Sequence, residues 1–145
     1  MQNRGFTLIE IMLLLAVSGI ILSSLVVVNQ TMLRTWQSNK LQASLEQELR
    51  VSMNSIVKHL QSALKIKRVT TNKISFLDQQ AKLRVIYYQS NTGLCLDSDL
   101  NVISKRISNL NYKLLNQLLV IKLEIAEQGQ SLSLKTAIKL QEKQL

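Results

Sequence analysis

Proline is absent from this chain of 145 residues, glycine occurs four times, and cysteine and histidine occur once each. A chain so poor in proline and glycine is neither collagen-like nor a low-complexity linker. The single cysteine, Cys95, excludes an internal disulfide, and the single histidine, His59, leaves no His/Cys cluster for zinc. Aromatic residues make up only 4% of the chain, so we expect no base-stacking surface. Most enzyme classes are therefore not expected, nor is a cofactor or a metal.

An apolar run near the N-terminus is the strongest feature that is present. Residues 6–28 are almost wholly apolar. As a helix rising about 1.5 Å per residue they span roughly 35 Å, enough to cross a bilayer core of about 30 Å. The residues after the run, Asn29 to Thr31, offer no small-x-small cleavage site. We predict a transmembrane helix over residues 6–28, with an ordinary cleaved signal peptide and a plain single-pass anchor as alternatives.

One carboxylate, Glu10, interrupts the apolar run. A charge at the centre of a membrane helix costs about 2.5–3.5 kcal/mol, and somewhat less near its end, so such a residue usually has a partner. No basic residue lies three or four positions away. A cut between Gly5 and Phe6 would create a charged amine one helical turn from Glu10. That amine could pair with the same chain's Glu10 or with Glu10 of a neighbouring subunit.

The string from Arg4 to Glu10, followed by the apolar helix, resembles the N-terminus of the type IV filament superfamily, which comprises type IV pilins and the pseudopilins of type II secretion and competence. The resemblance implies that a prepilin peptidase removes residues 1–5, cutting after Gly5, and that Phe6 is then N-methylated. It also implies that Glu10 pairs with the Phe6 amine of an adjacent subunit during assembly. The implied partners are other pilins in a helical filament, an inner-membrane assembly platform and membrane lipid.

The chain departs from many major pilins, which carry a proline about two turns beyond the position of Gly19; here Val27 lies near that place. Arg4 before the run is balanced by Arg34 and Lys40 after it, so the positive-inside rule does not settle the orientation. The resemblance implies that the C-terminal part lies outside the cytoplasm. The protein would first be a single-pass inner-membrane protein and then part of a pilus or pseudopilus, at the cell surface or in the periplasm.

An amphipathic pattern continues the helix beyond the membrane. Apolar residues recur every three or four positions, as expected for one face of a helix. These residues are Leu41, Leu45, Leu49, Met53, Ile56, Leu60 and Leu64. We predict a long helix over residues 6–66, whose outer half packs on a sheet, with a coiled-coil dimer as the alternative.

Apolar and polar residues then alternate with a period of two, the pattern of half-buried antiparallel strands. The alternating stretches are residues 74–76, 83–88, 110–114, 121–125 and 132–140. In the second stretch Leu83, Val85 and Tyr87 form the apolar face. Residues 91–93 and 128–130 supply turns, the second placed for a hairpin. The predicted class is therefore α+β, with the long helix packed on a C-terminal antiparallel β-sheet that occupies residues 67–145.

Positive charge is concentrated after the predicted helix. The chain carries 18 Lys and Arg against 9 Asp and Glu, for a net charge of +9. Six cations lie within residues 65–84: Lys65, Lys67, Arg68, Lys73, Lys82 and Arg84. They could bind phosphates of DNA or of lipid headgroups, dock acidic subunits, or form a solvated face.

Three further features have a structural and a functional interpretation. Asp97, Asp99 and Asn101 alternate as at the start of a calcium loop, but the glycine and glutamate of that loop are missing, so an exposed polar loop is the default. Cys95 is expected to be a small buried residue, and His59 a solvated or packing residue of the helix. No arrangement of residues supports catalysis.

The sequence favours a non-enzymatic subunit, a minor pilin or pseudopilin that helps to initiate or cap a filament. Residues 60–63 and 109–112 resemble, more faintly, the minor subunits of tip complexes. A competence pseudopilin that binds DNA through the six cations, a type II secretion minor pseudopilin and a membrane-anchored adaptor remain as alternatives.

Overall fold

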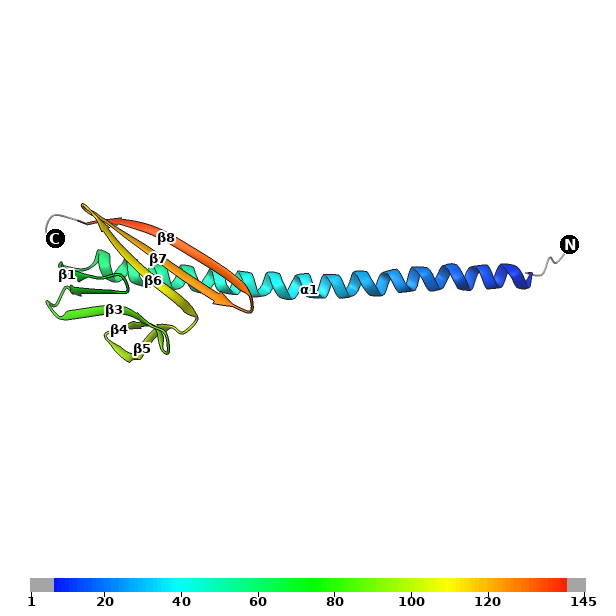
Figure 1. The fold of residues 1–145 in the computed structure, drawn as a ribbon, viewed down its shortest axis with the longest axis horizontal. Helices are drawn as coiled ribbons and strands as arrows, with labels where there is room; N and C mark the ends of the chain where they lie inside the picture. Colours follow the sequence, from blue (N-terminus) through cyan, green and yellow to red (C-terminus); the bar gives the residue numbers. More distant parts are fainter. Residues whose placement is uncertain (1–6, 141–145) are drawn as a thin grey trace. The chain divides into compact units, whose positions relative to one another are not determined.

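The computed structural model describes residues 7–140 and contains one helix and eight strands. The helix, α1 (Leu8–Gln61), is followed by the strands of two antiparallel sheets (Figure 1). The chain divides into two compact units, with the boundary between Leu41 and Gln42. The first unit is the N-terminal part of α1; the second contains the rest of α1 and all strands. The predicted α+β class, a long helix packed on antiparallel sheet, is confirmed.

The two parts of α1 differ in burial because only the second has strands to pack against. Every described residue up to Lys40 is exposed. In the second unit the predicted apolar stripe is buried at its five central positions, Leu45, Leu49, Met53, Ile56 and Leu60. The helix ends at Gln61, five residues before the predicted end at residue 66. The amide of Leu64 donates to the carbonyl of Leu77 at 2.9 Å, so the chain after Gln61 already pairs with a strand.

The first sheet contains five strands in the order β1-β2-β3-β4-β5. The strands are β1 (Lys65–Val69), β2 (Lys73–Leu77), β3 (Leu83–Gln89), β4 (Gly93–Leu96) and β5 (Ser98–Ser104). Of these, β1, β4 and β5 were not predicted. The first two residues of β1 lie where the helix was expected to continue. All four residues of β4 are buried, and its sequence shows no alternation of apolar and polar residues.

The face of β3 that packs on the core is opposite to the predicted one. Ile86 is fully buried and pairs with Ile74 of β2, whereas Leu83 is 56% exposed. Directly paired residues share a face of the sheet, so the register with β2 turns Ile86 inward and Leu83, Val85 and Tyr87 outward. Apolar residues lie on both faces of β3, and pairing with β2 decides which face is buried.

The second sheet contains β6 (Ile107–Leu115), β7 (Leu118–Glu127) and β8 (Gln130–Lys139), joined as consecutive hairpins. The predicted alternation is confirmed in β7, where Ile121, Leu123 and Ile125 are fully buried. The predicted turn at residues 128–130 is also confirmed. Gln128 and Gly129 both have positive φ, at 48° and 80°, between the paired residues Glu127 and Gln130, which is the geometry of a tight hairpin turn.

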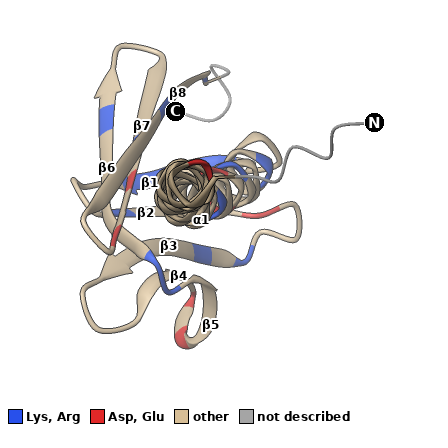
Figure 2. Cartoon of the chain, turned by 90° about the vertical axis from the view of Figure 1, so that its right-hand side faces the viewer, with Lys and Arg blue, Asp and Glu red and all other residues tan. Residues whose placement is uncertain are grey.

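The strands of both sheets lie around the C-terminal part of α1 (Figure 2). The core of this unit is formed by the buried helix residues together with Ile74, Phe76 and Ile86 of the first sheet and the inner residues of β7. Cys95 is buried and unpaired, as predicted. At Gly93, where φ is +87°, an added Cβ would lie 2.3 Å from the carbonyl oxygen of Ser104, so the approach of β4 to β5 requires glycine.

Candidate functional site: the N-terminal helix and the cationic surface

The side chain of Glu10 caps the N-terminus of α1. Its Oε2 accepts hydrogen bonds from the backbone amide of Thr7 at 3.1 Å and from the Thr7 hydroxyl at 3.0 Å. In return the amide of Glu10 donates to Thr7 Oγ1 at 3.4 Å. This reciprocal arrangement is a capping box, and its sequence signal is the Thr-x-x-Glu spacing of Thr7 and Glu10. Glu10 therefore has a partner within its own chain, although the sequence analysis found no nearby cation.

Gly5 and Phe6, the predicted sites of cleavage and methylation, lie outside the described residues. Both assignments stay predictions. Thr7 is the first described residue and accepts, through its carbonyl oxygen, the helical hydrogen bond from Ile11 at 3.3 Å. The helix begins at Leu8, three residues after Gly5, and its two capping residues belong to the chain that cleavage would leave.

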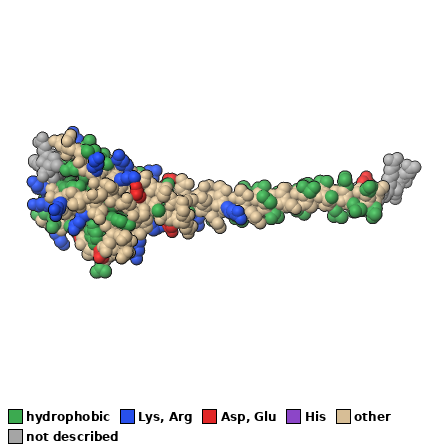
Figure 3. All heavy atoms as spheres, viewed as in Figure 1, with side chains coloured by type: hydrophobic (Ala, Val, Ile, Leu, Met, Phe, Trp, Pro, Cys, Tyr) green, Lys and Arg blue, Asp and Glu red, His purple; other side chains and the backbone are tan. Residues whose placement is uncertain are grey.

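The N-terminal part of α1 exposes apolar side chains on all sides. Among the described residues, α1 is the one helix long and apolar enough to cross a membrane. Figure 3 shows hydrophobic side chains along its visible face. The hydroxyls of Ser23, Ser24, Thr31 and Thr35 donate to carbonyl oxygens three or four residues earlier, at 2.7–2.9 Å. Because these donors are satisfied within the helix, they lower the cost of placing the segment in an apolar environment.

The six cations of residues 65–84 are divided by the fold. Lys65, Lys67 and Arg68 lie on β1, Lys73 on β2 and Lys82 in the turn before β3; these five are exposed. No described carboxylate forms an ion pair with any of the five. The irregular register between Ile66 and Arg68 is a bulge that inserts Lys67 into the edge strand.

The sixth cation, Arg84, forms an ion pair. Its Nε lies 2.7 Å from Oδ2 of Asp97, in a geometry that is an ion pair and not a hydrogen bond. The other oxygen of Asp97 accepts the amide of Val85 at 2.8 Å. Arg84 therefore holds the connection between β4 and β5 against β3, and it is not part of a free cationic surface.

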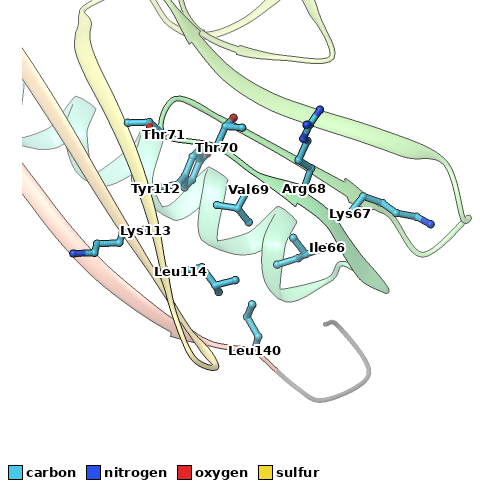
Figure 4. A pocket seen from close by; sticks show the side chains of 10 residues that line it. All are labelled: Ile66, Lys67, Arg68, Val69, Thr70, Thr71, Tyr112, Lys113, Leu114 and Leu140. Atoms are coloured by element: carbon cyan, nitrogen blue, oxygen red, sulfur yellow. The ribbon is translucent and has the colours of Figure 1, made fainter.

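A groove lies beside the exposed cations. It is lined by β1 and β6, which are the end strands of the two sheets, by the turn after β1 and by Leu140 (Figure 4). Its volume is about 500 Å³. Backbone contact between the sheets is made where Tyr112 N donates to Thr71 O at 2.7 Å. The Tyr112 hydroxyl is buried without a hydrogen-bond partner among the described residues, and burial raises the pKa of this phenol. Lys67, Arg68 and Lys113 line the same groove.

Two of the three candidate calcium ligands already have protein partners. Asp97 is bound to β3 as described, and Asp99 Oδ1 accepts a short hydrogen bond from the hydroxyl of Tyr87. That hydrogen bond raises the pKa of Tyr87 to about 12, because it stabilises the protonated phenol beside a carboxylate. Asp99 and Asn101 belong to β5, so the exposed loop expected here is a strand. Among residues 7–140 no group of three or more His, Cys, Asp or Glu could hold a metal ion.

A network around Arg106 joins elements that are distant in sequence. Arg106 Nε donates to Glu127 Oε2 at 2.6 Å, and its Nη1 donates to Glu48 Oε2 at 3.0 Å and to Ser44 Oγ at 3.1 Å. The network connects α1 with the end of β7 and with the segment before β6. The network was not predicted, and no local sequence signal indicates it, because the partners of Arg106 lie 21, 58 and 62 residues away.

Comparison with known families identifies the N-terminal segment. Residues 1–26 match the family model described as the prokaryotic N-terminal methylation motif, which is the class III signal peptide of type IV pilins and pseudopilins. This match confirms the resemblance drawn from the string that ends at Glu10. Neither a curated protein nor a solved structure matches the chain.

The matched segment, together with the apolar helix, supports a type IV pilin-like or pseudopilin protein that is anchored in a membrane. The motif implies processing by a prepilin peptidase and assembly with other pilins. It covers only the first 26 of 145 residues, so it leaves the role of the globular unit open.

Proposed function

We propose that this chain is a non-enzymatic structural subunit of a type IV pilus-like filament, and that it helps to initiate or cap assembly. The observation that carries the proposal is the N-terminal methylation motif at the start of a helix whose first part is apolar and exposed on all sides. Exposed apolar surface of this extent needs a lipid or protein environment. A membrane provides the first, and neighbouring helices in a filament provide the second.

Glu10 has two roles in this proposal. Within the chain it caps α1 through Thr7. Between chains its charge attracts the Phe6 amine that cleavage leaves on a neighbouring subunit. Two opposite charges buried together stabilise each other, whereas either charge buried alone is strongly penalised. The pair would therefore favour the correct axial register of helices in the filament.

Two substitutions separate these roles. Glutamine also serves as the last residue of a capping box, so Glu10→Gln keeps the cap but removes the charge, whereas Glu10→Val removes both. We expect both variants to reach the membrane and to be cut after Gly5. Breaking a buried pair costs about 3–5 kcal/mol, so both should enter filaments at least about tenfold less than the unmodified subunit.

The measurement is the ratio of subunit in sheared filaments to subunit in membranes, in cells with an active prepilin peptidase. Glu10→Asp is the control that keeps the charge on a shorter side chain, and it should be intermediate. Normal incorporation of Glu10→Gln together with loss of Glu10→Val would leave capping as the only role of Glu10. Normal incorporation of both would refute the pairing role.

The minor role is supported by the faint resemblance of residues 60–63 and 109–112 to tip subunits; these segments lie at the end of α1 and in β6. A subunit that initiates or caps assembly should be present in few copies per filament, and its deletion should abolish filaments. A copy number equal to that of the main subunit would contradict the minor role. Neighbouring genes for a secretin, a retraction ATPase or a DNA channel would indicate which machine it serves.

DNA binding is a second candidate function, favoured by the five exposed cations that no described carboxylate pairs with. We expect double-stranded DNA to bind the full chain in detergent with an affinity that falls as salt is raised, because each neutralised phosphate releases counterions. The double variant Lys67→Gln/Arg68→Gln should lower both the affinity for DNA and the steepness with which that affinity falls with salt. Arg84→Gln, which changes an ion-paired cation, should change that steepness less. Equal effects of the two variants would contradict a site on β1.

A further inference from the structure

One face of α1 stays apolar beyond Val28, where the apolar run as a whole ends. Val28, Met32 and Trp36 follow one another at intervals of four residues, which places them on one face of the helix. They are 55%, 66% and 60% exposed. The next residue at this interval is Lys40, whose Nζ lies 5.1 Å from the centroid of the Trp36 ring. We call Val28, Met32, Trp36 and Lys40 the interface stripe.

The length of the helix indicates what the interface stripe contacts. Glu10 is the first charge in the described part of α1. Val28 lies 18 residues further along, or roughly 27 Å, which is less than the bilayer core of about 30 Å. Trp36 lies 26 residues beyond Glu10, or roughly 39 Å, close to the 40–45 Å of a bilayer with its headgroup regions. If Glu10 lies at one interface, Trp36 lies at the other.

The side chains between Val28 and Trp36 are compatible with this depth. The hydroxyls of Thr31 and Thr35 are hydrogen-bonded to helix carbonyls at 2.9 Å and need no water. Asn29 and Gln30 lie near the edge of the bilayer core, from which long polar side chains can extend to the headgroups. Met32 and Leu33, 66% and 59% exposed, would otherwise present apolar surface to water.

The residues at the end of the interface stripe have the chemistry of a headgroup site. Tryptophan is enriched at membrane–water interfaces because its ring is apolar and its N–H is a donor. Lysine and arginine bind phosphate, and Arg34 adds a second cation within two residues of Trp36. A cation held against an aromatic ring keeps its charge close to the depth of that ring.

We propose that α1 crosses the second membrane interface at Trp36, where Trp36, Lys40 and Arg34 bind phospholipid headgroups. The segment in contact with the membrane then extends from Glu10 to Trp36, in place of residues 6–28. The inference rests on the membrane-anchored state in the proposed function. It adds the position of the boundary and the class of ligand, an anionic phosphate headgroup.

The only tryptophan of the chain makes the test direct. The full chain is reconstituted into vesicles of phosphatidylethanolamine and phosphatidylglycerol that contain lipids brominated either near the headgroup or near the end of the acyl chain. We expect blue-shifted Trp36 emission that the headgroup-proximal bromines quench more strongly. The matched control is Leu22→Trp in a Trp36→Phe background, which moves the probe to the middle of the apolar run, where the bromines at the chain end should quench more.

A second arm tests the headgroup site. Quenching is compared between vesicles in which the phosphatidylethanolamine is brominated and vesicles in which the phosphatidylglycerol is brominated, which measures how far anionic lipid is enriched around Trp36. One cation near an anionic surface contributes about 1 kcal/mol, so Lys40→Gln should lower this enrichment up to about fivefold. Lys105→Gln removes the same charge from an exposed site in the globular unit and should leave it unchanged.

Two results would overturn the inference. Quenching of the tryptophan at position 22 without quenching of Trp36 would show an inserted helix whose boundary lies before Trp36. Quenching of neither would show that the chain does not insert, which also contradicts the membrane-anchored state. Normal filament incorporation of Glu10→Gln and Glu10→Val, together with the expected Trp36 quenching, would refute the pairing role of Glu10 and leave this inference intact. The two failures can therefore be told apart.

Discussion

His59 lies near the C-terminal end of α1, where it is partly buried among charged groups. Burial is the main cause that lowers the pKa of this imidazole, and the nearby cations Arg84 and Lys58 lower it further. Asp97 acts in the opposite direction and raises it. The sequence interpretation of His59 as a solvated or packing residue agrees with its place beside the buried stripe. Lys58 precedes His59 in the sequence, whereas Arg84 and Asp97 come from β3 and from the residue after β4, and no sequence pattern shows that these two lie near His59.

We expect the titration of His59 to have a midpoint below the ordinary value of about 6.5. Because the folded state binds this proton less tightly than the unfolded state, the contribution of His59 to stability is present above about pH 6.5 and is lost as the pH falls through the lowered pKa. Proton NMR can follow it directly, since the chain contains one histidine.

The Asp97→Asn variant tests the cause of the shift. It removes the one group that raises the pKa of His59, so the midpoint should fall further. Asp99→Asn is the matched control because Asp99 is not among the groups that act on His59, and its midpoint should match that of the unmodified chain. A midpoint that rises in Asp97→Asn would contradict the arrangement of charges around His59.

At the scale of elements, α1 is attached to the sheets by apolar burial and by the Arg106 network. Leu45 and Leu49 are the first two buried residues of the helix, and Ser44 and Glu48, which bind Arg106, lie next to them. The network therefore fixes the place where the helix enters the globular unit. Hydrogen bonding to Glu127 and to Glu48 raises the pKa of Arg106, which stays charged at any physiological pH.

Replacing Arg106 by methionine should lower the free energy of unfolding of the globular unit by about 1 kcal/mol. Both ion pairs keep about a quarter to a third of their side chains exposed, and exposed pairs contribute about 0.2–1 kcal/mol each. Urea unfolding of the full chain in detergent, followed by circular dichroism, measures the change. Lys105→Met is the control at a neighbouring exposed cation. Equal stability of the two variants would show that the network contributes nothing measurable.

The strands show how far local pattern determines an element. In β7 the alternation of apolar and charged residues predicted the strand and its buried face, because charged side chains allow only one face to be buried. In β3 apolar residues lie on both faces, and pairing with β2 decided that Ile86 is inside. In β4 all residues are buried, so no alternation exists to be detected.

At the scale of the whole molecule, the chain divides where its source of stabilisation changes. From Thr7 to Lys40 every residue is exposed, and the apolar surface of this part of the helix is available to a membrane or to other subunits. From Gln42 on, the helix and the two sheets form a conventional core. The predicted domain boundary between residues 66 and 67 separated helix from sheet, whereas the compact unit includes the second part of the helix.

The sequence by itself determined the N-terminal methylation motif, the apolar span, the amphipathic helix and the α+β class, because each depends on residues that are close along the chain. The tertiary structure alone decided the division into two sheets and the inner face of β3. It also decided the Arg106 network and the ion pair that removes Arg84 from the cationic surface. These features depend on register and on contacts between residues 13 to 62 positions apart. Packing of the whole unit selects among such contacts, and local periodicity carries no information about them.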